Sequence, residues 1–358
     1  MRLFGFFSVA ILGVIQLFAC TGILVEAEDR STVNGRTVEF GIELDMSLAV
    51  TPRKVTFYGK TPMGKGMHYI SKYAAAGVYC FDDPVIMDGI NEKGLVAAAF
   101  YFSGYASYTK VTKDNQAKAL SPIDFPNWIL TQFATIEEVK EALKSVVIAP
   151  TIIKNWGNTP PPMHYIVYDK SGRSIVIEPV EESLQVYENE LGVITNSPTF
   201  DWQLTNLGNY TNLTPYNIGP NQLRSFKFPS FGQGSGMLGL PGDFTPPSRF
   251  VRAAFFSART LPPKNSGDAV DKTFHILNQF DIPLGIVRQK DQDKTSYDYT
   301  LLTSVKEPKT LRYFYRSYQD QSIQFVDLNQ FDLNAKTIKM MKVGGDQQQY
   351  DVSSKLQQ

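Results

Sequence analysis

The chain has 358 residues, its 35 Lys and Arg are balanced by 35 Asp and Glu, and its isoelectric point is near 6.8. This balance argues against a dedicated nucleic-acid-binding protein, which needs a basic face to displace counterions. Hydrophobic residues make up 43% and aromatic residues 13% of the chain, enough to bury a core, so global disorder is excluded.

The first 19 residues have the composition of an export signal. Arg2 precedes an apolar run that begins at Leu3, and small Ala19 ends it before the chain turns polar. We therefore expect residues 1–19 to be a removed signal peptide and the protein to be periplasmic or secreted. A retained membrane anchor is the alternative.

Cys20 follows the leader directly, and two fates compete for it. The run Leu17-Phe18-Ala19-Cys20 resembles a lipoprotein signal, in which the cysteine is acylated and the protein is tethered to a membrane. Cleavage before Cys20 would instead leave a first residue with both a thiol and an α-amine. An α-amine has a pKa of about 7.7–8.0 and can accept the thiol proton. The signal alone favours neither fate.

The sequence after residue 19 predicts several strands, followed by two helices. Apolar alternation on either side of a turn at Asp29–Gly35 predicts a hairpin. Further strands are expected at Val55–Tyr58, Ala76–Phe81 and Leu95–Phe102. A helical stretch follows Pro126, and Thr135 with Glu138 forms a capping box for a helix over Ile136–Val146.

The second half alternates in the same way. The predicted elements are a hairpin of His164–Tyr168 and Ser174–Glu178, helices at Arg249–Ser257 and Lys272–Phe280, and strands at Tyr299–Val305, Thr310–Tyr318 and Ser322–Asp327. Between them, Phe200–Gly242 is rich in Asn, Gly, Pro and Ser and predicts a long irregular excursion. This order favours antiparallel sheets with helices packed on them, in one domain over residues 20–358.

Only two cysteines, Cys20 and Cys80, and three histidines occur. A disulfide scaffold and a zinc site with several thiolates are therefore excluded. The histidines are far apart and show no metal-binding spacing, so we expect neither a metal nor another cofactor. Cys80 is expected to be a small buried apolar residue.

Three polar residues occupy positions that secondary-structure propensity does not explain. Arg36 follows the predicted turn, Asn196 ends an apolar strand, and Arg249 lies at a helix start, where its charge opposes the helix dipole. Taken singly, a surface charge or ordinary turn chemistry accounts for each.

Five motifs in order change this reading: Cys20–Gly22, Gly35–Glu39, Gly89–Leu95, Thr195–Trp202 and Gly239–Arg252. Together they resemble the choloylglycine hydrolase family, which contains the bile salt hydrolases and penicillin V acylases. The resemblance extends from Cys20 to about Leu328. It implies an α+β fold, the four-layer αββα sandwich of N-terminal-nucleophile hydrolases, and hydrolysis of linear, non-peptide amide C–N bonds.

The resemblance also implies roles for single residues. Cys20 would be the nucleophile, with Arg36 beside its thiol, where a cation favours the thiolate. The Asn196 side chain and the Tyr101 main-chain N–H would stabilise the oxyanion. Arg249 would complete the polar wall of the site.

The family usually has Asp to hold the α-amine, and this sequence has Glu39 instead. Tyr101 stands where many bile salt hydrolases have Asn and penicillin V acylases have Tyr, which favours penicillin-V-like or N-acyl amides over bile salts. Candidate lining residues for an apolar acyl pocket are Phe40, Met46, Phe100 and Phe102.

The expected partner is a small amide with an apolar acyl group. The segment around Gln203–Pro215 corresponds to one that builds subunit contacts in the family, which favours a homo-oligomer, such as a homotetramer. The alternative function is a lipoprotein tethered at Cys20 that binds a ligand without catalysis.

Overall fold

The computed structural model describes residues 19–41, 44–80, 84–153, 156, 159–291 and 294–357. The predicted signal peptide therefore lies outside the described residues, except for Ala19. Among the residues that are described, no helix is both long and apolar enough to cross a bilayer.

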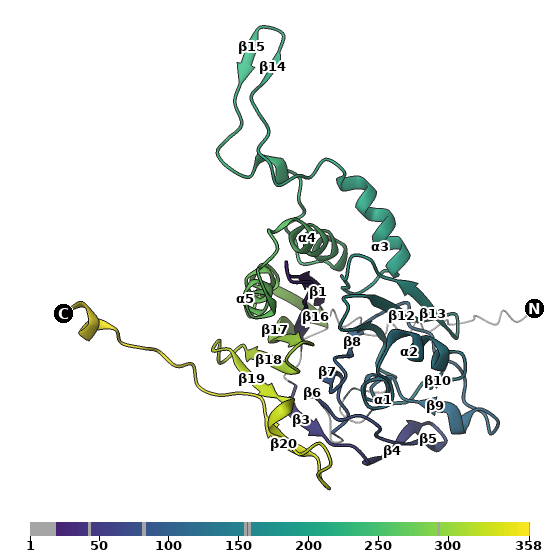
Figure 1. Cartoon of the computed structure of the whole chain (residues 1–358). Coiled ribbons are helices and arrows are strands. Elements are labelled where there is room, and N and C mark those ends of the chain that lie inside the picture. Colours follow the sequence, from purple (N-terminus) through teal and green to yellow (C-terminus); the bar gives the residue numbers. More distant parts are fainter. Residues whose placement is uncertain are drawn as a thin grey trace, which may run out of the picture.

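Two antiparallel sheets form the centre of the molecule (Figure 1). In the first sheet the strand order is β1 (Cys20–Glu26), β2 (Thr32–Phe40), β17 (Lys294–Glu307), β18 (Arg312–Ser317) and β19 (Gln324–Asp327), and β16 (Val287–Asp291) also pairs with β17. In the second the order is β13 (Ser183–Glu188), β12 (Ser174–Val180), β11 (Met163–Tyr168), β8 (Val96–Tyr101), β7 (Asp88–Asn91), β6 (Ala75–Tyr79), β3 (Ser47–Thr51) and β20 (Lys339–Lys342).

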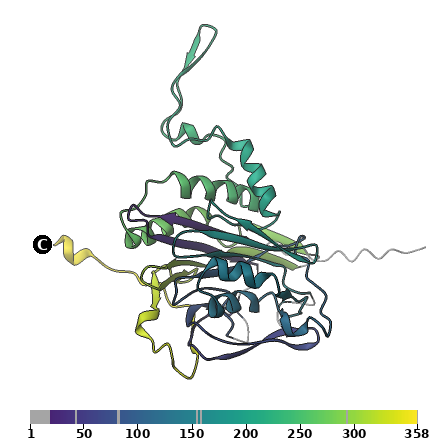
Figure 2. The same ribbon diagram turned by 45° about the vertical axis from the view of Figure 1, so that its right-hand side comes forward.

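Helices cover the outer face of each sheet (Figure 2). Helices α4 (Pro246–Arg259) and α5 (Ser266–Leu277) pack on the first sheet, and α1 (Asp124–Gln132) packs on the second together with α2 (Ile136–Leu143). Strand β8 shows why four layers form, because its side chains alternate between faces. Ala98 and Phe100 join the core between the sheets, whereas Ala97 and Ala99 join the core under α1 and α2. The predicted αββα sandwich is confirmed.

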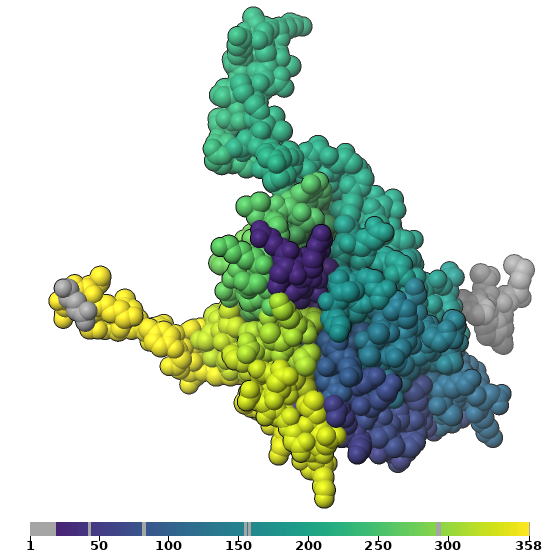
Figure 3. All heavy atoms as spheres, viewed as in Figure 1, coloured from purple at the N-terminus to yellow at the C-terminus, as the bar shows by residue number. Residues whose placement is uncertain are grey.

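Short strand pairs lie around the two central sheets. Hairpin β4 (Thr56–Thr61) and β5 (Gly64–Ile70) lies beside the parallel pair β9 (Ala119–Leu120) and β10 (Val147–Ile148). The excursion after Phe200 is more ordered than predicted, because it starts with helix α3 (Phe200–Asn206). The chain between Tyr210 and Pro246 then projects from the body, and we call it the arm (Figure 3). The arm carries the hairpin of β14 (Asn221–Leu223) and β15 (Phe226–Phe228).

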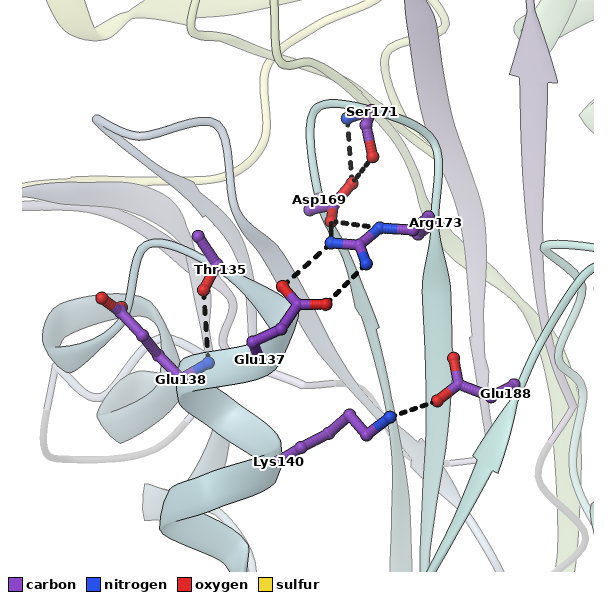
Figure 4. Close-up of polar contacts among 8 residues, drawn as sticks. All are labelled: Thr135, Glu137, Glu138, Lys140, Asp169, Ser171, Arg173 and Glu188. Atoms are coloured by element: carbon purple, nitrogen blue, oxygen red, sulfur yellow. Dashed lines mark hydrogen bonds and ion pairs between the residues drawn. The ribbon is translucent and has the colours of Figure 1, made fainter.

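Polar contacts anchor α2 to the second sheet (Figure 4). The predicted capping box forms: Glu138 N–H donates to Thr135 Oγ1 at 3.2 Å, and the Glu138 carboxylate accepts the Ala134 N–H at 2.7 Å. Arg173, in the turn between β11 and β12, donates two hydrogen bonds to Glu137. Because Arg173 is about half exposed, this pair adds little stability and mainly sets how α2 lies.

A charged cluster lies buried between the two sheets. Asp88 of β7 forms an ion pair with Lys306 of β17, and it accepts hydrogen bonds of 2.7 Å from Ser304 and from the hydroxyl of Tyr313. Burial by itself raises the pKa of Asp88, but Lys306 and Arg36 outweigh burial and hold this pKa below its usual value. The carboxylate is therefore charged and joins the two sheets.

This cluster predicts a large asymmetry between single and double substitutions. Asp88→Ala leaves the Lys306 ammonium buried without its partner, so we expect the free energy of unfolding to fall by about 3–5 kcal/mol. The double variant Asp88→Ala/Lys306→Met removes both charges and should recover most of that loss. Urea denaturation of the three proteins measures both effects, and a loss below about 1 kcal/mol for Asp88→Ala would contradict the assignment.

Candidate active site

Cys20 begins β1, an edge strand of the first sheet, and pairs with Val38 of β2. In the full-length chain its nitrogen is part of the Ala19–Cys20 peptide bond. The Ala19 carbonyl accepts the Glu39 main-chain N–H at 3.0 Å, and Ala19 and Cys20 are both buried. An amide nitrogen has no basic lone pair, so the chain lacks the proposed general base as long as Ala19 is attached.

Asn196 meets Cys20 because of strand register. Gly22 of β1 exchanges two main-chain hydrogen bonds with Ile194, of 2.8 and 3.1 Å, in an antiparallel bridge. Because the bridge is antiparallel, Cys20, two residues before Gly22, comes opposite Asn196, two residues after Ile194. Its Oδ1 accepts the Cys20 N–H at 2.8 Å, and its Nδ2 donates to the Tyr101 carbonyl at 2.8 Å. Among the described residues, the Tyr101 carbonyl is the acceptor that the Asn196 amide group is seen to use.

Arg249 ties these groups together from the first turn of α4. Its guanidinium donates to the Cys20 carbonyl, to Thr21 Oγ1 at 2.9 Å and to Asn196 Oδ1 at 2.6 Å. The side chain is fully buried, and burial lowers its pKa to about 10, so the group is still charged at neutral pH. The charge that opposes the helix dipole is thus held by the start of β1 and by Asn196.

Arg36 lies in the middle of β2, opposite Gly22, rather than at the end of a turn as the sequence predicts. Its guanidinium donates to the Ala99 carbonyl at 2.6 Å and lies 3.9 Å over the Phe100 ring. In the full-length chain burial raises the pKa of the Cys20 thiol, and the opposing effect of Arg36 is smaller. The cation is therefore not enough to form the thiolate at neutral pH in the full-length chain.

Glu39 does not hydrogen-bond to the Cys20 nitrogen, whose acceptor is Asn196. A bulge in β17 brings Thr300 opposite Glu39, and the Thr300 hydroxyl donates to Glu39 Oε1 at 3.1 Å. The other carboxyl oxygen, Oε2, is buried without a hydrogen-bond partner among the described residues. Burial raises the pKa of Glu39 to about 7. Glu39 is therefore held through one carboxyl oxygen, by Thr300, while the other is buried.

An apolar cavity opens beside the Cys20 thiol. Phe40 and Met46 line it, as predicted from the sequence, together with Tyr101 and Trp156. The Trp156 ring lies 5.1 Å from the ring of Phe40 and 6.1 Å from that of Tyr101. These rings form an aromatic wall suited to an apolar acyl group.

Phe100 and Phe102, the other two predicted lining residues, do not line this cavity. Phe100 fills the space under Arg36, where a Cβ at Gly22 would approach its ring to 2.9 Å. Phe102 stacks on His164 at 4.3 Å. Both are fully buried core residues, and the pocket assignment is corrected for them.

Cys80 also departs from expectation. It is partly rather than fully buried and lines the same cavity as Cys20. Burial raises the pKa of the Cys80 thiol to about 12, so this thiol stays protonated at neutral pH. The two cysteines of the chain therefore face one cavity, and burial raises the pKa of both thiols.

Sequence reasoning missed the polar groups that support the site from other strands: Thr300, Asp88, Lys306, His164 and Glu178. Each lies in an ordinary strand pattern, and local sequence does not show which buried strand positions come together. Lys306 comes directly after the predicted strand Tyr299–Val305, and the structure extends that strand to include it.

Comparison with known proteins identifies the family of this chain. The family model described as linear amide C–N hydrolases, choloylglycine hydrolase family, matches residues 20–341. The chain belongs to this family of linear amide hydrolases.

Its relatives include enzymes named for two kinds of substrate. It is 36% identical over 329 residues to a bile salt hydrolase/transferase of Clostridium perfringens, covering 90% of this chain and 96% of that protein. It is 26% identical over 321 residues to a penicillin V acylase of Pectobacterium atrosepticum, covering 84% of this chain and 78% of that protein.

Solved structures share the fold. A variant of conjugated bile acid hydrolase from Clostridium perfringens matches with a TM-score of 0.81 at 34% identity, over 93% of this chain and 100% of that chain. Penicillin V acylase from Agrobacterium tumefaciens matches with a TM-score of 0.73 at 24% identity, over 91% of this chain and 92% of that chain.

The Glu39 carboxyl predicts a pH-dependent stability in protein that retains Ala19. Its pKa rises on folding from 4.5 to about 7, so the folded state binds this proton more tightly and loses stability as pH rises across that window. Glu39→Gln should change little at pH 4 and stabilise the protein by about 2–3 kcal/mol at pH 8. Urea midpoints at the two pH values test this, and equal shifts at both would contradict it.

Proposed function

We propose that removal of the leader converts this chain into an exported amidohydrolase whose nucleophile is the Cys20 thiol and whose general base is the Cys20 α-amine. The observation that carries the proposal is the hydrogen bond from the Cys20 nitrogen to Asn196 Oδ1, beside an apolar cavity that the thiol faces. This contact would hold the freed amine next to its own thiol. No metal or organic cofactor takes part in the scheme.

The reaction has two halves. The α-amine takes the thiol proton, and the thiolate attacks the amide carbon while the second Nδ2 hydrogen of Asn196 and the Tyr101 main-chain N–H stabilise the oxyanion. The ammonium then protonates the leaving nitrogen, which leaves a thioester on Cys20. Water, activated by the amine, attacks the thioester carbonyl, releases the acid and restores the thiol.

The surrounding charges support this cycle. The ammonium form of the amine has the unpaired Glu39 Oε2 as an acceptor within the same buried region. Glu reaches one methylene further than the family's usual Asp, and Thr300 holds its other oxygen. Arg36 and Arg249 oppose the effect of burial and lower the pKa of the thiol.

Conjugated bile salts are the first substrate class we propose, because relatives named for bile salts are up to 36% identical, against 26% for the penicillin V acylase. Phenoxymethylpenicillin is the second candidate. It is favoured by Tyr101, whose ring lies beside Trp156 in the cavity wall and suits an aryl acyl group.

The proposal predicts that activity requires a free Cys20 at the N-terminus. We expect Cys20→Ser, or retention of Ala19, to reduce turnover by at least about 1,000-fold. Mature protein is assayed in parallel with glycocholate, phenoxymethylpenicillin and a long-chain N-acyl homoserine lactone. Full turnover by protein that retains Ala19 would overturn the mechanism.

Intact-mass measurement of the exported protein separates the enzyme from its rival. A mass that begins at unmodified Cys20 supports the hydrolase and its export. A diacylglyceryl mass on Cys20 supports the tethered lipoprotein that binds a ligand, because acylation blocks the thiol.

We also propose that the protein is a homo-oligomer, such as a homotetramer, joined through the arm. The arm stands away from the body (Figures 1 and 3) and exposes large apolar side chains, namely Tyr216, Leu223, Phe226, Phe231 and Leu238. Clustered exposed apolar side chains are typical of protein interfaces. A second copy of the chain is the partner that the family resemblance favours.

Substitution on the arm tests this assembly. The double variant Leu223→Ser/Phe226→Ser should lower the mass measured by light scattering during size-exclusion chromatography, because it removes apolar contact area. Leu261→Ser, at an equally exposed position outside the arm, is the matched control and should leave the mass unchanged. A monomeric wild type, or an unchanged mass for the arm variant, would contradict the proposal.

A further inference from the structure

A buried histidine–glutamate pair lies behind Asn196. His164 is on β11, opposite Phe100 of β8, and Glu178 is on the neighbouring strand β12. His164 Nδ1 lies 3.1 Å from Glu178 Oε1, and both side chains are 98% or more buried. The other ring nitrogen, Nε2, lies 3.1 Å from the main-chain carbonyl of Thr195. The mechanism above uses neither residue.

Both nitrogens of the ring face an oxygen. Glu178 Oε1 lies at Nδ1, and both Glu178 oxygens also accept the Phe200 N–H, at 3.0 and 3.2 Å. The Thr195 main-chain carbonyl can only accept, so Nε2 donates to it. Phe102 stacks flat on the ring, with an interplanar angle of 3°. The ring is therefore held at both nitrogens and on one face.

The Thr195 carbonyl belongs to the peptide that carries Asn196. The two residues before Asn196 have contacts of their own. Ile194 is fixed by its bridge to Gly22, and the Thr195 hydroxyl donates to the Pro246 carbonyl at 3.1 Å. His164 supplies the bond to the Thr195 carbonyl, on the peptide plane from which the Asn196 side chain starts. A small rotation of this plane would move Asn196 Oδ1 away from the Cys20 nitrogen.

We propose that His164, held by Glu178, is a positioning residue for catalysis: it locks the Thr195–Asn196 peptide so that Asn196 holds both the Cys20 amine and the oxyanion. This inference rests on the proposed N-terminal-cysteine mechanism. His164 transfers no proton to substrate, because neither of its nitrogens lines the cavity and both are occupied.

The first test is His164→Gln in the mature protein. Gln keeps a polar side chain but cannot contact Glu178 and the Thr195 carbonyl from the two ring positions at once. Because the oxyanion contact acts mainly in the transition state, we expect kcat to fall about 10–100-fold, the usual range for a supporting residue, while KM changes much less.

Glu178→Gln is the second variant, and it replaces the carboxyl group at His164 Nδ1 by an amide of the same shape. The amide oxygen can still accept from Phe200, so folding is preserved, but the contact with His164 Nδ1 is weakened. A fall in kcat with little change in KM is again expected. It should be smaller than for His164→Gln, because the bond from His164 Nε2 to the Thr195 carbonyl is kept.

A double-mutant cycle with Asn196→Ala decides whether the effect passes through Asn196. If it does, His164→Gln lowers kcat by less than about twofold once Asn196 is gone, because the group that it positions is absent. A merely structural role would lower kcat by the same factor in both backgrounds. That additive result, with either His164→Gln or Glu178→Gln, would overturn the proposal.

Asn127→Ala is the matched control. Asn127 is also fully buried and joins α1, on which it lies, to other parts of the chain, because it accepts the Ile86 N–H at 3.1 Å and donates to the Tyr69 hydroxyl at 3.1 Å. It does not line the cavity beside Cys20. The variant should lower stability without lowering kcat at a temperature where the protein is folded.

The same double-mutant cycle can be measured through the rate of Cys20 alkylation, without any amide substrate. Iodoacetamide alkylation of Cys20, followed by mass spectrometry with Cys80 as the internal reference, reports how the amine and thiol are held. Wild-type protein inactive on every amide would end the proposed function. Non-additive alkylation rates in such protein would still support positioning by His164, and additive rates would refute it.

Discussion

One buried guanidinium is the constraint on which the site depends. Arg249 reaches from the first turn of α4 to the Cys20 carbonyl, to Thr21 and to Asn196. It therefore joins an outer helix, the edge strand β1 and the segment after Ile194 at a single point. A charge buried this deeply is tolerated only when its donors are satisfied, so the three elements cannot shift independently.

The edge position of β1 brings Cys20 and Asn196 together. An edge strand leaves one side of its main chain unpaired, and here Ile194 takes that side at Gly22. The first residue of the strand can then meet Asn196 on one side and the cavity on another. In the proposed mechanism, the peptide bond between Ala19 and Cys20 decides whether the base exists, because its cleavage would free the α-amine.

Paired polar groups in the middle of the apolar sandwich hold the strands of the site in one arrangement. Asp88 with Lys306 joins the two sheets, Thr300 holds Glu39, and His164 with Glu178 supports the peptide before Asn196. Each buried polar group costs free energy unless it is paired, so each restricts its neighbours to one arrangement. The capping box and ion pairs of α2 lie on the outside and only position that helix (Figure 4).

Sequence by itself determined the elements and most of the site's membership. Alternating apolar residues, turn residues and the Thr135 capping box depend on near neighbours, and the order of five motifs identified the family from Cys20 onward. Tertiary structure alone decided which buried groups meet. The predicted turn at Gly35 lies inside β2, Phe100 supports Arg36 instead of facing substrate, and His164 lies behind Asn196. The reason is that strand pairing joins residues far apart in the chain, and its register and facing are set by the packing of whole sheets.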